Sequence, residues 1–164
     1  MVRGASSSGK EIQLVVFSLH GEEFGIDIRQ VKEVLKVTQV TYLPHTAEYI
    51  QGVINLRGEV IPVINLRIRF GIPTDDEKKE TQRIIIVEIE GTLVGLIVDS
   101  VSEVIGLPLE AIETPSGTIA GTKSHFLEGV GKYNDRLLII LKLDMILTTE
   151  ERISLSELED WQDG

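Results

Sequence analysis

The stretch Gly52-Val-Ile-Asn-Leu-Arg-Gly-Glu-Val-Ile-Pro-Val-Ile-Asn-Leu66 contains two apolar runs that meet at Arg57-Gly58. Valine and isoleucine fit the pleated surface of a strand, and a glycine between two such runs supplies the positive φ of a tight turn. The stretch therefore predicts a β-hairpin. Because Pro62 has no backbone N–H to donate, we expect its strand to lie at a sheet edge or to carry a bulge.

Similar hairpin patterns lie on both sides of this stretch. Upstream, the apolar run 12–19 is followed by a polar turn and by the alternating segment Phe24-Gly-Ile-Asp-Ile28. Downstream, the runs 84–90 and 92–98 flank Gly91. Short β-branched runs punctuated by turn residues are typical of strands. The chain holds 16 Val, 21 Ile and 18 Leu against four Ala, which also favours a mainly β protein.

Two other segments differ from this pattern. Val31, Val34 and Leu35 recur at helical spacing while charged residues occupy the positions between them, which predicts a short amphipathic helix. Residues 71–82 are polar and contain a proline, and we interpret them as a connector between two strand-rich halves.

The two halves resemble each other. Residues 24–35 match 94–105 at an offset of 70, and residues 50–53 with 60–66 match 127–130 with 137–143 at an offset of 77. The second copy thus carries an insertion around 109–123. Self-similarity of this kind indicates one unit used twice. With about five strands per unit, we expect two small β-barrels packed on each other, because closure removes exposed sheet edges.

Composition limits the possible functions. The net charge of −10 repels phosphate backbones, so we expect no nucleic-acid partner. The chain has no cysteine, which excludes disulfides, thiolate nucleophiles and Cys-ligated metals and is compatible with a reducing cytoplasm. Its longest apolar runs are far below the roughly 18 residues of a membrane span, so we expect no membrane insertion.

The sequence shows no catalytic motif. Residues 4–10 approach a phosphate-loop pattern, but Glu11 replaces the Ser or Thr that binds magnesium and no strand precedes Gly4. We interpret residues 1–10 as a flexible tail. His20, His45 and His125 lie in expected turns and lack metal-ligand spacing. Residues 150–164 predict a C-terminal helix or tail. An enzymatic activity is therefore unsupported, although a catalytic site assembled from distant residues stays open, and no motif of the sequence calls for a metal or a cofactor.

Several residues have two interpretations. Arg57 is either an exposed cation at a hairpin tip or a fork aimed at a partner's carboxylate or carbonyl groups. Glu33 and Glu103, which repeat on the same face of the expected helix, are either surface charges or contact residues. The same choice applies to the valines at equivalent positions of the two halves, which are either core or contact residues: Val31, Val34, Val101 and Val104.

The stretches 52–67, 24–34 and 94–104 resemble the CheW family of chemotaxis coupling proteins, and the resemblance runs from about 12 to 147. It implies two intertwined five-stranded barrels of SH3-like type around a shared core. The boundaries are about 24–80 for the first barrel, and 12–23 with 81–149 for the second, within a CheW-like domain of residues 11–149. It also implies a cytoplasmic, non-catalytic adaptor that joins the tips of methyl-accepting chemoreceptors to the histidine kinase CheA in membrane-associated arrays.

The resemblance further implies two binding faces. A groove between the barrels resembles the receptor-tip site and is lined by Val31, Glu33, Gly95, Val101 and Val104. A second face resembles the contact with the regulatory domain of the kinase and includes Val40, Thr41, Gly52, Arg57 and Gly58. Gly52 and Gly95 would allow either the close approach of a partner's backbone or a strained φ.

Other functions stay open on the sequence. The same domain occurs in CheV and CheA, although this chain ends without receiver or kinase segments, which favours the free adaptor. Two small barrels could instead form a ligand-binding or hydrolytic domain with 109–123 as a lid. A nucleic-acid-binding barrel is a third possibility, with local support only from Arg57, Arg67 and Arg69.

Overall fold

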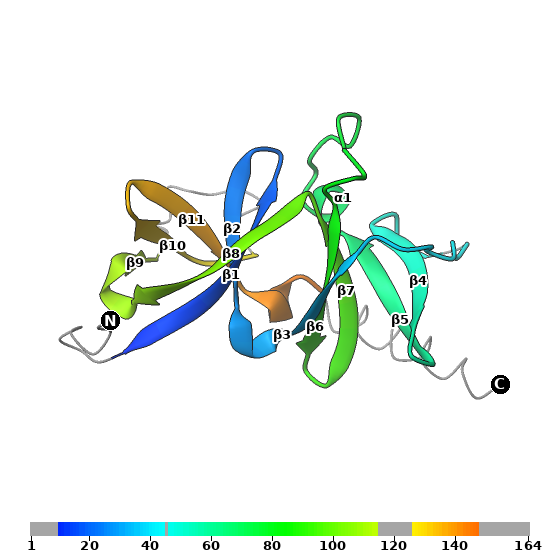
Figure 1. The fold of residues 1–164 in the computed structure, drawn as a ribbon, viewed down its shortest axis with the longest axis horizontal. Helices are drawn as coiled ribbons and strands as arrows, with labels where there is room; N and C mark the ends of the chain where they lie inside the picture. Colours follow the sequence, from blue (N-terminus) through cyan, green and yellow to red (C-terminus); the bar gives the residue numbers. More distant parts are fainter. Residues whose placement is uncertain (1–9, 45, 115–125, 148–164) are drawn as a thin grey trace.

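The computed structural model describes residues 10–44, 46–114 and 126–147, which form two β-sheets lying side by side (Figure 1). The six-stranded sheet has the strand order β8-β1-β2-β11-β10-β9 and lies on the left of the view. The five-stranded sheet has the order β3-β6-β7-β5-β4 and lies on the right. The prediction of a mainly β protein is confirmed. The expected C-terminal helix, the 1–9 part of the expected tail, and residues 115–123 of the insertion lie outside the described residues.

The strands are β1 (Glu11–Leu19), β2 (Glu22–Asp27), β3 (Val31–Lys36), β4 (Ile50–Leu56), β5 (Glu59–Asn65), β6 (Arg83–Ile89), β7 (Thr92–Val98), β8 (Ser100–Pro108), β9 (Ile112–Glu113), β10 (Leu127–Tyr133) and β11 (Arg136–Leu141). Short helical turns connect some of them: η2 (Ile28–Gln30), α1 (Leu66–Arg69), η3 (Leu109–Ala111) and η5 (Leu143–Met145).

The two halves of the chain exchange their first hairpins. β1 and β2 join the six-stranded sheet by pairing with β8 and β11, whereas β6 and β7 join the five-stranded sheet by pairing with β3 and β5. The expected barrel boundaries placed all of 81–149 with 12–23. In the structure, β6 and β7 (83–98) lie instead in the five-stranded sheet. The reason is that the hairpin β6–β7 pairs with strands of the first half, a long-range choice that local sequence does not encode.

Four two-residue turns join the hairpins, and both residues of each have positive φ. The turns are His20-Gly21, Arg57-Gly58, Glu90-Gly91 and Asn134-Asp135. Their twist matches that of the flanking strands, which is why such turns dominate short hairpins. The predicted turn at Arg57-Gly58 is confirmed. The side chain of Asn55 stabilises it by accepting a 2.9 Å hydrogen bond from the amide of Gly58.

The predicted helix around Val31 is wrong, because residues 31–36 form strand β3. Its side chains alternate between half-buried and exposed positions, and its backbone pairs with β6. Val34 consequently points outward, where it is 40% exposed. The i, i+3, i+4 spacing was misleading because pairing with β6 satisfies the backbone of a run that is too short to form a stable helix alone.

The expectation that Pro62 marks an edge strand is also wrong, and the register shift of the β4–β5 pair lies between Ile50 and Gly52 on β4 rather than at Pro62. β5 lies between β7 and β4, and Pro62 pairs in regular register with Val53. The parallel pairing of β5 with β7 begins one residue later, at Val63. An interior strand therefore tolerates the proline, because the imide lies just before the stretch that pairs with β7.

In each sheet, the segment that follows the edge strand β3 or β8 crosses to the other side of the sheet and pairs there with β4 or β10. After β3, the amide of Thr41 donates to the carbonyl of Val53 in β4 at 2.8 Å, and Val53 donates back at 2.9 Å. After β8, the short strand β9 pairs with β10. Gly52 makes room for the first of these returns, because a Cβ on it would lie 2.0 Å from the carbonyl oxygen of Thr41.

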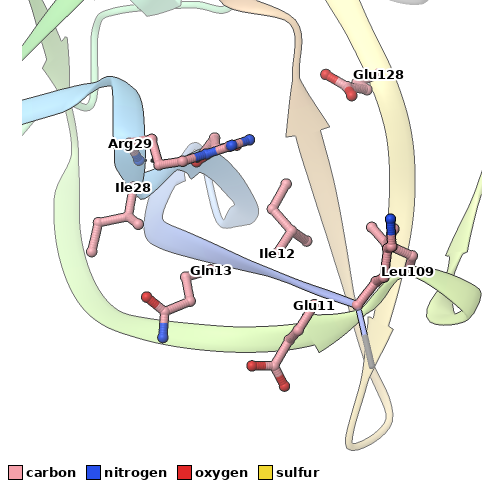
Figure 2. Close-up of a pocket in the computed structure, with 9 residues that line it drawn as sticks. Glu11, Ile12, Gln13, Ile28, Arg29, Leu109 and Glu128 are labelled. Carbon is pink, nitrogen blue, oxygen red and sulfur yellow. Dashed lines mark hydrogen bonds and ion pairs between the residues drawn. The ribbon is translucent and has the colours of Figure 1, made fainter. Parts of the chain in front are cut away.

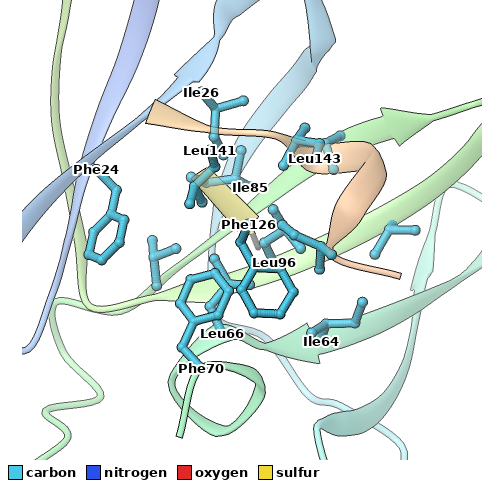
Figure 3. Packing of buried hydrophobic residues seen from close by; sticks show 14 of the residues in the cluster. Phe24, Ile26, Ile64, Leu66, Phe70, Ile85, Leu96, Phe126, Leu141 and Leu143 are labelled. Atoms are coloured by element: carbon cyan, nitrogen blue, oxygen red, sulfur yellow. The ribbon is translucent and has the colours of Figure 1, made fainter. Parts of the chain in front are cut away.

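The largest apolar cluster lies between the sheets and takes residues from both. Figure 3 shows Phe24, Phe70 and Phe126 in this cluster beside aliphatic residues from both sheets, such as Ile85 and Leu141. The rings are in contact, with centroids 6.1 Å apart for Phe24–Phe70 and 5.0 Å apart for Phe70–Phe126. Two smaller clusters each lie within one sheet. The burial of large apolar side chains between the sheets is the main force that joins them.

We predict that Gly52→Ala lowers the free energy of unfolding by about 2–4 kcal/mol, because a Cβ would clash with the backbone of Thr41 and φ is +152° there. Urea denaturation followed by circular dichroism measures the loss. Gly58→Ala is the control: it also has positive φ but open space around it, so we expect a loss of about 1 kcal/mol. Equal losses for the two variants would contradict the steric argument.

Candidate partner-binding surfaces

The groove set comprises the five residues predicted to bind a receptor tip: Val31, Glu33, Gly95, Val101 and Val104. Val31 in β3 and Val101 in β8 occupy equivalent positions of the two halves, and both are half-buried against the cluster between the sheets. Val104 is 52% exposed on β8. Of the three valines in the groove set, Val104 is therefore exposed on β8, and Val31 and Val101 lie at the edge of the core.

Val34, which the sequence allows as either a core or a contact residue, is not a member of the groove set. It is 40% exposed on β3, at the position equivalent to Val104 on β8. Exposed valines therefore occupy matching positions of β3 and β8, one in each sheet. The offset of 70 between the two halves is the sequence signal that relates Val34 to Val104.

Gly95 does not lie at the surface. It is buried in β7, and a Cβ on it would meet Ile84 Cγ2 at 2.8 Å and Val63 Cγ2 at 3.5 Å. The close approach that Gly95 permits is therefore made by side chains of its own sheet. Any effect of this residue on a partner would be transmitted through the packing of the five-stranded sheet.

The hairpin set comprises the five residues predicted to bind the kinase: Val40, Thr41, Gly52, Arg57 and Gly58. The structure brings them to one part of the five-stranded sheet, because the backbone of Thr41 is bonded to β4 next to Gly52. Thr41, Arg57 and Gly58 are exposed, whereas Gly52 is buried. Val40 packs against the apolar cluster of this sheet. The three exposed residues are therefore accessible to a partner, whereas Val40 and Gly52 take part in the packing of the sheet.

An ion pair joins the two sets. Arg57 Nη2 donates to Glu33 Oε2, so the tip of the β4–β5 hairpin is tied to β3 at the other end of the strand order. The hydrogen bond to Glu33 raises the pKa of Arg57 above its usual value. Glu33 is therefore not an isolated surface charge. The side chain of Arg57 remains 71% exposed, which leaves most of it accessible to a partner.

The other sheet has an equivalent ion pair that sequence reasoning missed. Arg136, beside the β10–β11 turn, donates from Nη2 to Glu103 at 2.7 Å and to Glu23 at 2.8 Å. The hydrogen bonds from Arg136 lower the pKa of Glu23. The signal was the repeat of Glu33 as Glu103, but Arg136 lies two positions beyond the residue that matches Arg57.

The three arginines that supported a nucleic-acid-binding function do not form a basic patch. Arg67 is buried and paired with Asp99 and Asp76. Arg69 lies between the rings of Tyr49 and Phe126 and donates to the carbonyl of Ile146 at 2.7 Å. Because Arg57 is paired with Glu33, each guanidinium has a separate intramolecular role, and this alternative loses its local support.

A candidate location for the ligand-binding alternative is an open hollow of about 810 Å³ near the start of β1 (Figure 2). Its charged side chains Glu11, Arg29 and Glu128 stand apart from one another, and Arg29 is engaged by Asp27. The side chains therefore do not converge on one point, as those of a specific ligand site usually do. Residues 109–113 of the supposed lid form η3 and β9, and β9 is held in the six-stranded sheet by its pairing with β10.

The described residues show two further features that bear on function. Among them, no three or more His, Asp or Glu side chains are grouped so that they could hold a metal ion. His20 is half-exposed and lies 3.7 Å from Asp76, whereas His45 and His125 lie outside the described residues. In the same part of the chain, no helix has the length and apolarity needed to cross a bilayer.

Comparison with known proteins places this geometry in a family. The family model described as a CheW-like domain matches residues 13–151. "Chemotaxis protein CheW" of Bacillus subtilis is 37% identical over 138 residues, which are 84% of this chain and 88% of that protein. "Chemotaxis protein CheW" of Klebsiella aerogenes is 34% identical over 142 residues, covering 85% of this chain and 83% of that protein.

A solved structure agrees with both relatives. The crystal structure of the scaffolding protein TtCheW from Thermoanaerobacter tengcongensis superposes with a TM-score of 0.78 at 44% sequence identity, covering 87% of this chain and 91% of that one. The family match includes every strand described above except the first two residues of β1. The chain therefore belongs to the family of CheW-like domains.

Proposed function

We propose that this protein is a non-catalytic chemotaxis adaptor that couples the cytoplasmic tips of methyl-accepting chemoreceptors to the histidine kinase CheA. It acts in the cytoplasm, is recruited to membrane-associated receptor arrays and needs no cofactor. The observation that carries the proposal is the presence of two different surfaces, the exposed valines of β3 and β8 and the hairpin set, in a chain of the CheW-like family. An adaptor needs two such surfaces, one for each partner.

Each sheet, in this proposal, is one SH3-like barrel of a pseudo-repeat. The offsets of 70 and 77 carry β1 to β5 onto β6, β7, β8, β10 and β11, in the same order within the two sheets. The return of Thr41 to Val53 and that of Glu113 to Val130 support closure at equivalent places. Closure protects the edge strands from pairing with other chains.

The hairpin set is the proposed contact with the regulatory domain of the kinase. Thr41, Arg57 and Gly58 offer an exposed rim of mixed polarity, and the buried Gly52 keeps the Thr41 segment against β4. The kinase domain resembles this family, so the contact is a pseudo-symmetric docking of one barrel on another. Arg57 can exchange or share its contact with Glu33 when a partner carboxylate approaches.

The groove set is the proposed receptor site. The helical hairpin of a receptor tip would lay its apolar face across β3 and β8, in the helix-in-groove mode. Val104 contributes an exposed apolar side chain there, and Val34 adds an equivalent one on β3. Val31 and Val101 line the base of this surface, where they join the core. Contacts of this size give modest pairwise affinity, which the array multiplies.

We predict that Arg57→Ala weakens binding to the kinase regulatory domain about tenfold, because it removes the charged group at the tip of the hairpin set. Titration calorimetry with the purified kinase domain measures the loss. Arg136→Ala is the matched control, since it removes the equivalent arginine from the other sheet and should change binding by less than about twofold. Equal weakening by both variants, or none by Arg57→Ala, would contradict the assignment of the hairpin set.

We predict that Val104→Asp weakens capture of a receptor-tip fragment about tenfold, because a carboxylate would be desolvated against the apolar face of the helical hairpin. A quantitative pull-down measures the effect, and circular dichroism verifies that the variant is folded. The control is Leu137→Asp, which charges another exposed apolar side chain outside the groove set. If wild-type protein captured neither the receptor fragment nor the kinase domain, the adaptor function itself would be wrong.

A further inference from the structure

Arg67 is the buried centre of an ionic cluster that neither binding surface uses. Its side chain is 4% exposed, and its Nε donates to Asp99 Oδ1 at 2.8 Å while its Nη2 donates to Asp99 Oδ2 at 2.5 Å. Its Nη1 donates to Asp76 Oδ1 and to the carbonyl of Pro73, both at 2.6 Å. We call Arg67, Asp76 and Asp99 the Arg67 hub. All three guanidinium nitrogens have an acceptor within it.

Asp99 lies where the chain crosses from one sheet to the other. It is the single residue between β7 of the five-stranded sheet and β8 of the six-stranded sheet. Its amide donates to the carbonyl of Ser18 in β1 at 3.0 Å, and its Oδ2 accepts from the amide of His20 at 2.8 Å. One carboxylate therefore contacts the β1–β2 hairpin of one sheet and Arg67, which follows β5 of the other.

The hub also holds the connector between the two halves. Pro73 and Asp76 belong to the polar segment 71–82, and Glu77 of the same segment accepts a 3.3 Å hydrogen bond from Asn65. Asn65 in turn caps α1 through the amide of Arg67 at 2.9 Å. The connector is thus bound to the end of β5 by two neighbouring side chains. The guanidinium of Arg67 links it to the crossing point of the chain.

The physical character of the hub suits it to fix an angle. Apolar burial between the sheets is favourable but non-directional, so it does not by itself specify how one sheet is turned against the other. A bidentate arginine–carboxylate pair restricts both distance and orientation. Breaking a buried pair by removing one partner is costly, because it leaves an uncompensated charge, so the hub stays assembled in the folded protein.

We propose that the Arg67 hub fixes the angle between the two sheets and that Arg67 is thereby a positioning residue for signal transfer between receptor and kinase. This inference rests on the proposed adaptor function. The receptor groove takes β3 from one sheet and β8 from the other, so its shape depends on that angle. The Arg57 tip, in contrast, is carried by the five-stranded sheet alone. Loosening the hub would change the relation between the two surfaces without altering a residue of either.

The first test measures the angle directly. The chain has no cysteine, so Lys36→Cys and Glu128→Cys, two exposed positions on different sheets, give a unique pair of spin labels for distance measurement by electron spin resonance. The variant Arg67→Met/Asp99→Asn removes both buried charges while keeping similar volumes, a change that folded proteins tolerate. We expect a broader or shifted distance distribution than in the wild type.

The matched control is Arg136→Met/Glu103→Gln, which removes an ion pair that lies within the six-stranded sheet and should leave the distribution unchanged. Circular dichroism verifies folding of every variant. If the hub double variant is unfolded, Arg67→Lys replaces it, since lysine keeps the charge but cannot form the bidentate pair. A hub variant that is folded and has the wild-type distribution would overturn the proposal.

The second test separates positioning from binding. Kinase autophosphorylation stimulated by receptor fragments is measured with wild-type and hub-variant adaptor. We expect capture of the kinase domain to stay close to wild type and capture of the receptor fragment, whose groove depends on the angle, to fall by no more than about twofold, while stimulation falls at least about fivefold. Undiminished stimulation would overturn the proposal. If wild type binds neither partner, the adaptor function fails, and the distance measurement still decides whether the hub fixes the angle.

Discussion

The exchange of hairpins between the two halves is the constraint on which the rest of the structure depends. The parallel pairs β5–β7 and β2–β11 place strands of one half inside the sheet built mainly by the other. Neither sheet is complete with the strands of one half alone. The chain must therefore cross between the sheets, and the apolar cluster that it encloses draws residues from both. One shared core follows from this topology.

The two halves share a register shift and a glycine at equivalent positions, where a returning segment meets a strand. β4 and β10 each carry a register shift at the residue before a glycine, Gly52 in one and Gly129 in the other. Each glycine leaves room for the segment that returns to that strand, from Thr41 or from Glu113. The β4–β5 hairpin also carries an arginine that pairs with a glutamate on β3, and the β10–β11 hairpin carries one that pairs with a glutamate on β8. The differences between the copies, such as the additional carboxylate of Glu23, make the two ends of the molecule chemically distinct.

The tripeptide Asn-Leu-Arg occurs at the end of β4 (residues 55–57) and again at the end of β5 (residues 65–67). The two copies have different structural roles. Asn55 stabilises a hairpin turn, and Arg57 lies at the surface. Asn65 caps α1, and Arg67 is buried against Asp99. Identical local sequence thus gives an exposed arginine in one case and a buried arginine in the other. The difference comes from which acceptors the fold brings within reach.

Local sequence determined most of the strands, the turn at Arg57-Gly58 and the existence of two related halves, because alternation, β-branching and turn residues act over a few neighbours. Tertiary structure decided that residues 31–36 form a strand, that Pro62 lies in an interior strand and that Gly95 is buried. It also decided that Arg57 pairs with Glu33 and that Arg67 pairs with Asp99. Each of these depends on strands and side chains far apart in the chain, whose pairing is selected by burial of the shared core and by the satisfaction of buried polar groups.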